Sequence, residues 1–121
     1  MVLVDTSVWI NHFREASAKL AALLDQELVL VHPFVIGELA CGNLADRKDI
    51  VALLHALPAC PQADDDEVLF FIERHRIMGC GLGLIDIHLL ASCKLAGCGL
   101  WTDDLRLRKV ARDLEIEAGQ P

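Results

Sequence analysis

The stretch MVLVDTSVWI, residues 1–10, places one carboxylate and two hydroxyl groups between two apolar runs. The first run, Val2 to Val4, is typical of a buried strand, and the second belongs to a helix. Asp5 falls where the strand ends and a helix begins. This position suits Asp either as a helix N-cap or as part of a functional site, and the stretch alone leaves both interpretations open.

Two more apolar runs, LVLV at residues 28–31 and CGLW at residues 98–101, are predicted strands. Apolar residues at helical spacing predict helices over residues 8–14, 16–26, 33–41, 46–57, 64–78, 84–95 and 104–114. Asp46 and the acidic run at residues 64–67 are expected to cap two of these helices, and residues 115–118 form a possible last strand. This alternation predicts an α/β fold with a mostly parallel central sheet.

The composition fits one domain that covers residues 1–121. Hydrophobic residues make up 54% of the 121 residues, which is enough for a core of ordinary size. The chain has 11 Lys plus Arg against 18 Asp plus Glu, a formal net charge of -7, which is not typical of a nucleic-acid-binding protein. A local basic patch is compatible with an acidic total, so the charge does not exclude such a function.

The cysteines contain no C-x-x-C pair and lie mostly among apolar neighbours, so we expect buried free thiols rather than disulfides or a zinc site. They are Cys41, Cys60, Cys80, Cys93 and Cys98. The histidines lack the spacing of zinc hydrolases, and His88 is expected to be packed rather than catalytic. No apolar run reaches the ~18 residues that cross a membrane, and the start lacks the basic segment of a signal peptide. We therefore expect a cytoplasmic protein.

Acidic residues follow two of the predicted strands. Asp5 ends the first strand, and Thr102-Asp103-Asp104 follows CGLW. Ligands of open parallel sheets bind in the crevice outside the carboxyl ends of the strands, so these acids are expected to face one crevice. Either Asp103 or Asp104 also suits the N-cap of the last helix without any further role.

Two more acids interrupt apolar helices. Glu38 in FVIGELACG is expected to border the buried stripe of its helix, where pairing with an arginine is the alternative to a functional role. Asp86 in GLGLIDIHLLA lies in the first turn of its helix, where the helix dipole alone favours a negative charge.

Four carboxylates that converge on one crevice repel each other unless a cation neutralises them. Oxygen ligands suit Mg²⁺ or Mn²⁺ far better than Zn²⁺. Such a cation binds a phosphate oxygen, lowers the pKa of a bound water and stabilises the leaving oxygen of an in-line displacement. These residues therefore indicate metal-dependent phosphodiester hydrolysis.

Four motifs, taken together and in this order, resemble a PIN domain, and specifically the toxin of a VapBC-type toxin–antitoxin pair. The motifs are VLVDTSVWI, FVIGELACGNL, GLGLIDIHLLASCKL and LWTDDLRLRKVA, and they cover nearly the whole chain. The resemblance implies a three-layer α/β/α fold and a Mg²⁺- or Mn²⁺-dependent endoribonuclease. It also implies a homodimer that a cognate antitoxin inhibits and that stops growth by cutting structured or translation-related RNA.

The resemblance carries over to individual residues of this chain. The implied catalytic residues are Asp5, Glu38, Asp86 and Asp104, and the metal ligands among them are Asp5, Asp86 and Asp104. Asp104 is assigned because it completes a Thr-x-Asp pattern with Thr102, while Asp103 takes the variable middle position and a supporting role. Thr6 matches the family's hydroxyl beside the first acid and is expected to orient a carboxylate or a metal-bound water.

The last predicted helix is basic and offers a surface for RNA phosphates beside the acids. Its basic residues are Arg106, Arg108, Lys109 and Arg112. A solvated helix face explains the same residues equally well. The chain has no Tyr, and its Phe and Trp residues lie in apolar runs, so recognition of RNA by base stacking is not expected.

Two other functions compete with a nuclease. A receiver-like phosphate-signalling module also has an acidic, magnesium-binding crevice, but it requires paired acids after the first strand and a Lys after a late strand. This chain has the single Asp5 and no Lys at LWTDD. The second competitor is a nuclease-like domain that only binds a partner, and the presence of all four acids argues against such a loss of activity.

Overall fold

The computed structural model describes residues 1–119, which contain seven helices and three strands. The strands are β1 (Val2–Val4), β2 (Val29–Leu30) and β3 (Gly99–Trp101). The helices are α1 (Thr6–Arg14), α2 (Ala18–Asp25), α3 (Pro33–Cys41), α4 (Arg47–His55), α5 (Asp65–His75), α6 (Leu84–Ala96) and α7 (Leu105–Asp113). Every predicted helix is present, and none of these helices is long and apolar enough to span a bilayer.

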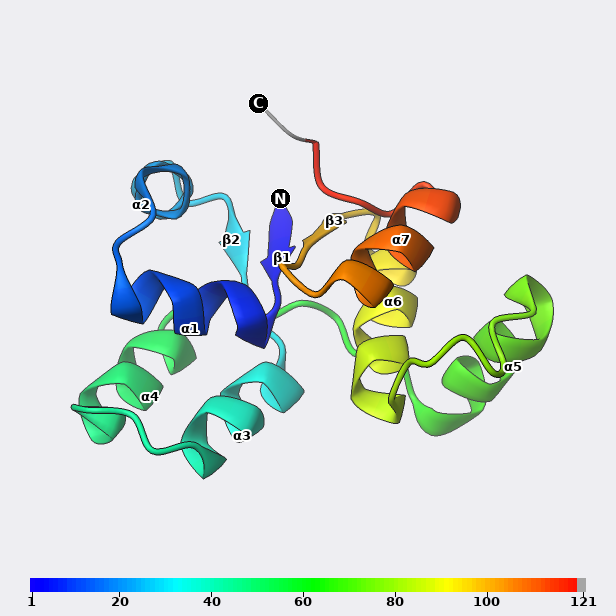
Figure 1. Cartoon of the computed structure of the whole chain (residues 1–121), viewed down its shortest axis with the longest axis horizontal. Coiled ribbons are helices and arrows are strands. Elements are labelled where there is room, and N and C mark those ends of the chain that lie inside the picture. The colour runs from blue at the N-terminus through cyan, green and yellow to red at the C-terminus, as the bar shows by residue number, and fades with distance from the viewer. Residues whose placement is uncertain (120–121) are drawn as a thin grey trace.

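The three strands form one parallel sheet in the order β2-β1-β3. Leu3 pairs with Leu30 on one side and with Leu100 on the other, and all three side chains are buried. In Figure 1 the strands lie between a group formed by α1–α4 and a group formed by α5–α7, with α6 packed on β3. This is the predicted three-layer α/β/α arrangement, and the parallel order brings the carboxyl ends of β1 and β3 side by side.

Two local predictions were wrong. Residues 115–118 form no strand; only Glu117 pairs with Leu100 in a single parallel bridge, because the left-handed backbone of Glu115 (φ 59°) turns the chain just before it. Asp46 precedes α4 but makes no side-chain cap, since its own backbone is left-handed (φ 55°) instead of the extended conformation that lets a cap side chain reach the first turn.

The acidic run at residues 64–67 caps a helix, as predicted. The Asp64 carboxylate accepts a hydrogen bond from the Glu67 backbone N–H at 2.7 Å, and the Asp64 N–H donates to the Glu67 carboxylate at 3.0 Å. This reciprocal pair starts α5. The densest acidic segment of the chain is therefore explained by helix formation alone.

The free thiols divide into two groups. Cys60 and Cys93 are buried and Cys98 is partly buried, whereas Cys41 and Cys80 are exposed, so the prediction of buried thiols was wrong for these two. Cys41 ends α3 and Cys80 lies in the glycine-rich turn before α6, and both positions face solvent. His88 is buried against the edge of the Phe34 ring, with ring centroids 4.8 Å apart, as expected for a packed side chain.

Candidate active site

Asp5 lies at the carboxyl end of β1, and its backbone N–H is bonded to the Trp101 carbonyl of β3 at 2.9 Å. It is the residue before α1, but its side chain does not cap that helix. Instead its Oδ2 accepts hydrogen bonds from the hydroxyls of Ser7 at 2.8 Å and Thr102 at 2.7 Å. The carboxylate is only 5% exposed. The cap interpretation of Asp5 was therefore wrong, and Oδ1 is the oxygen left for a ligand.

The two acids after β3 have separate environments. Asp104 caps α7, because its Oδ1 accepts from the Leu107 N–H at 3.0 Å, and the residue is exposed. Asp103 instead accepts a hydrogen bond from Asn11 at 2.8 Å and lies 3.6 Å from the Arg108 guanidinium. Asp103 is thus already partnered, whereas Asp104 keeps its second carboxylate oxygen for other contacts.

Hydroxyl groups connect the ends of β1 and β3. Thr102 donates to Asp5 through Oγ1 and accepts the Asp104 N–H at 3.0 Å on the same atom. Ser7 Oγ accepts the Asp103 N–H at 3.0 Å while it donates to Asp5. Ser7 was not among the predicted site residues, and neither was Asn11. The sequence feature that could have identified these two residues is their separation of four positions, which places both on one face of α1.

Glu38 lies on α3 and is exposed, so the expectation that it borders the buried stripe was wrong. Its Oε1 accepts a hydrogen bond from the Thr6 hydroxyl at 2.7 Å. Thr6 thus orients Glu38, and the hydroxyls that orient Asp5 come from Ser7 and Thr102. Since Thr6 directly follows Asp5, this bond holds Glu38 beside the carboxyl end of β1.

Asp86 is the acid whose pKa responds to the charges of the other three. It lies in the first turn of α6, where its Oδ2 accepts the Gly83 N–H at 3.3 Å. Burial raises the pKa of Asp86 above its ordinary value, and the charges of Asp5, Asp104 and Glu38 raise it further, while the Gly83 N–H works in the opposite direction. The four predicted acids therefore lie close enough together for the charges of the other three to act on Asp86.

The possible ligands that these four acids offer are carboxylate oxygens, which suit Mg²⁺ or Mn²⁺. Within residues 1–119, no three His, Cys, Asp or Glu side chains are already arranged around a single ion position. Mg²⁺ keeps several waters and binds through one or two carboxylates together with substrate phosphates, so it does not require a closed set of protein ligands. The residues present thus fit a hydrated cation shared with a phosphate.

Three of the four basic residues on α7 are already engaged. Arg108 donates to the Thr102 carbonyl at 3.2 Å and lies beside Asp103. Lys109 pairs with Asp113 at 2.9 Å, and Arg112 pairs with Glu117 at 3.2 Å. The predicted RNA-binding residues are therefore not equivalent, and most of their charge is balanced by acids in α7 or in the segments directly before and after it.

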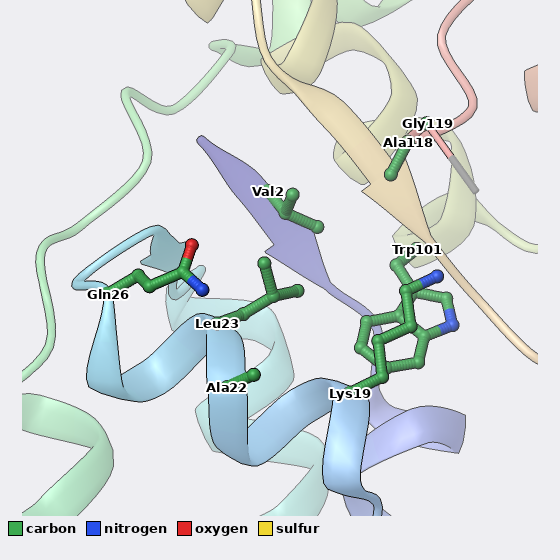
Figure 2. Close-up of a pocket in the computed structure, with 8 residues that line it drawn as sticks. All are labelled: Val2, Lys19, Ala22, Leu23, Gln26, Trp101, Ala118 and Gly119. Atoms are coloured by element: carbon green, nitrogen blue, oxygen red, sulfur yellow. The ribbon is translucent and has the colours of Figure 1, made fainter. Parts of the chain in front are cut away.

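A separate cleft of about 490 Å³ lies between α2, β1 and β3 and contains none of the predicted site residues (Figure 2). The Lys19 ammonium lies 4.6 Å from the centroid of the Trp101 ring, and Trp101 is only 9% exposed. The Trp101 ring is thus covered by the Lys19 side chain.

Comparison with known proteins agrees with the fold. Residues 2–113 match the PIN domain family. The chain is 47% identical over 109 residues to Ribonuclease VapC32 of Mycobacterium tuberculosis, strain ATCC 25618 / H37Rv, and to the protein of the same name from strain CDC 1551 / Oshkosh. Each match covers 89% of this chain and 88% of the relative.

Proposed function

This chain belongs to the PIN domain family, and we propose that it is a Mg²⁺- or Mn²⁺-dependent endoribonuclease, the toxin of a toxin–antitoxin pair. The observation that carries the proposal is the cluster of acids near the carboxyl ends of β1 and β3. It contains the buried Asp5 carboxylate, which has no cationic partner within residues 1–119, and three further acids beside it. Such a charge distribution suits a cation and a phosphodiester.

Asp5, Asp86 and Asp104 would hold the cation, which when bound polarises the phosphate and lowers the pKa of water. Ser7 and Thr102 keep the Asp5 carboxylate in one orientation, and Asp104 is held by the first turn of α7. Glu38 is exposed, and Thr6 occupies only its Oε1. Its Oε2 is therefore placed to accept a proton from the attacking water.

The test is cleavage of total cellular RNA by the purified, antitoxin-free protein with Mn²⁺ or Mg²⁺. We expect discrete fragments that are absent with EDTA and absent with Asp5→Asn. Asp25→Asn makes the same chemical change at an exposed position on α2 and should cleave normally. If the unmodified protein binds Mn²⁺ and yields no fragments, the alternative of a non-catalytic binding module is supported instead.

The antitoxin site that we propose is an apolar groove of about 540 Å³ beside Glu38. The groove is lined by residues of α1, α3 and the turn before α4, including Ile10, Phe13, Leu39 and Leu44. A protein segment in this groove lies next to the acids, where an arginine side chain competes with the metal for the carboxylates. Such competition would explain how the antitoxin inhibits the enzyme. We also propose that the protein acts in the reducing cytoplasm, where the five free thiols persist.

The homodimer interface that we propose is the opposite group of helices, α5 and α6. Phe70 is 70% exposed and Leu95 54% exposed beside a groove of about 630 Å³. The same groove contains Asp66 and Glu67 together with Arg74 and Lys94. A face with both signs of charge can complement a two-fold copy of itself, because each acid meets a base of the other copy.

Two variants distinguish these surfaces. Phe70→Glu should shift the protein from dimer to monomer in sedimentation velocity, while Phe13→Glu should leave the dimer intact. Conversely, co-expression of the small protein encoded beside this chain should relieve the growth arrest caused by the unmodified protein and by Phe70→Glu, but not the arrest caused by Phe13→Glu. Unimpaired growth with soluble unmodified protein present would contradict the toxin function.

A further inference from the structure

Arg106 differs from the other basic side chains of α7. Arg108, Lys109 and Arg112 each lie within ion-pair distance of an acid on their own helix or beside it. Arg106 is exposed, and no carboxylate of residues 1–119 forms an ion pair with it. Among the four predicted RNA-binding residues, it is thus the one whose charge remains unbalanced.

Arg106 lies across the glycine-rich turn that leads into α6. A Cβ atom on Gly81 would stand 3.1 Å from one guanidinium nitrogen of Arg106 and 3.4 Å from its Cδ, and the left-handed backbone of Gly81 (φ 81°) also disfavours a side chain. The turn ends at Gly83, whose N–H binds Asp86, and Arg106 itself follows Asp104 by two residues. The Arg106 side chain therefore extends from the helix that Asp104 caps to the turn that precedes Asp86.

This placement combines an unpaired cation with an acidic crevice in a chain of net charge -7. RNA approaching the crevice is repelled by carboxylates on most sides, so an adjacent free guanidinium offers a specific attraction for its phosphates. The planar guanidinium donates two parallel N–H groups to phosphate oxygens, which fixes orientation as well as distance. A paired arginine such as Arg112 would first have to break its contact with Glu117.

We propose that Arg106 binds a phosphate of the RNA next to the scissile bond and so positions the strand over the four acids. This inference rests on the proposed ribonuclease function and adds a substrate-binding residue to it. Gly81 contributes to this placement, because its missing side chain leaves the room that the Arg106 guanidinium occupies.

The test compares Arg106→Gln with Arg112→Gln, a matched loss of one exposed arginine on the same helix. All proteins also carry Asp5→Asn so that the RNA is not cut. Binding of a fluorescein-labelled RNA stem–loop is measured by anisotropy with Mn²⁺ at several KCl concentrations. Arg106→Gln should weaken binding about 10-fold and reduce the slope of log K against log salt by about 0.7 to 0.9, the change expected for one lost phosphate contact. Arg112→Gln should retain both values, and Arg106→Lys should recover the slope but only part of the affinity.

Three outcomes would overturn this inference: an unchanged slope in Arg106→Gln, an equal loss in Arg112→Gln, or no salt-dependent binding of the stem–loop to the Asp5→Asn protein. Steady-state cleavage by proteins that retain Asp5 distinguishes failure of the Arg106 inference from failure of the proposed ribonuclease function. If the unmodified chain cuts RNA and Arg106→Gln has the same KM, only the role of Arg106 is wrong. If the unmodified chain does not cut RNA with Mn²⁺, the nuclease function itself is wrong.

Discussion

Asp5 is a charged group placed where only 5% of its surface reaches solvent, with hydroxyl groups as its hydrogen-bond partners. Burying a carboxylate without a cation opposes folding, and the two hydroxyl donors offset part of that cost. Asp86 shows the same conflict, because burial and three neighbouring carboxylates raise its pKa and so disfavour its charged form in the folded protein. A cation in the crevice should therefore stabilise the fold as well as enable the chemistry.

The Thr102 hydroxyl is the contact on which two of these acids depend. Thr102→Val keeps the shape of this buried side chain but removes the donor to Asp5 and the acceptor for the Asp104 N–H. We expect Mn²⁺ affinity to fall about 10- to 100-fold, as measured by isothermal titration calorimetry, because the ligands lose their orientation. Thr102→Ser retains the hydroxyl and should bind Mn²⁺ nearly as well as the unmodified chain. Equal affinity of the Val and unmodified proteins would contradict the proposed role.

At the scale of elements, three of the four acids lie where helices begin. Asp5 directly precedes α1, Asp86 lies in the first turn of α6, and Asp104 caps α7. Helix N-termini carry partial positive charge and unpaired N–H groups, which favour nearby carboxylates. Converging helix starts thus help to explain how the metal-free fold tolerates acids that repel one another. Glu38 is the exception, because it lies in the middle of α3.

Asp104 caps α7 and has a proposed role in catalysis, and substitutions can separate the two. Asn is as good an N-cap as Asp but carries no charge, so Asp104→Asn should keep the thermal midpoint and lose RNA cleavage. Asp104→Ala loses both the charge and the bond to the Leu107 N–H, and should also lower the free energy of unfolding by about 1 kcal/mol. Urea denaturation and the cleavage assay measure the two effects. Full activity of Asp104→Asn would remove this residue from the site.

At the scale of the molecule, a buried histidine joins the two groups of helices. His32 is fully buried; its Nδ1 accepts the Phe34 N–H of α3 at 3.0 Å, and its Nε2 lies 3.2 Å from the Ser92 hydroxyl of α6. Ser92 also accepts the Ala63 N–H, from the segment that leads to α5, at 3.1 Å. Desolvation by burial, and to a lesser extent the charge of the nearby His88, lower the pKa of His32 to about 4.

This histidine predicts a loss of stability in mild acid. Between its ordinary pKa of 6.5 and its folded value of about 4, the unfolded chain binds a proton that the folded chain does not. The free energy of unfolding should therefore fall as the pH drops from 6.5 to 4, by up to about 3 kcal/mol, and be insensitive to this group above 7. Urea denaturation across this pH range measures the effect.

His32→Asn keeps a good N-cap for α3 and should flatten that part of the pH profile. His55→Gln changes an exposed histidine at the end of α4 and should leave the profile unchanged. A full acid response in His32→Asn would assign the effect to other groups.

Local patterns were sufficient to predict most of this fold. The apolar runs at residues 2–4, 28–31 and 98–101 became the three strands, and the seven helical patterns became helices, because hydrophobic spacing and caps act over a few residues. Asp5 and Asp104 were expected to lie near one another because residues at the carboxyl ends of parallel strands share one edge of the sheet. Glu38 and Asp86, which lie in helices, were assigned from the resemblance of their motifs. The exceptions, Asp46 and residues 115–118, lie at or next to left-handed backbone that no residue type in the sequence required.

The hydrogen-bond partner of each site residue depended on contacts between residues far apart in the chain. Thr102 reaches Asp5 over 97 positions, and Asn11 reaches Asp103 over 92, so Asp103 is occupied and Asp104 remains available. Thr6 and Ser7 are neighbours in sequence, yet they orient Glu38 and Asp5 respectively. These partners follow from the pairing of β1 with β3 and the packing of α1 on α3, because a hydrogen bond requires a distance and an angle that local sequence does not specify.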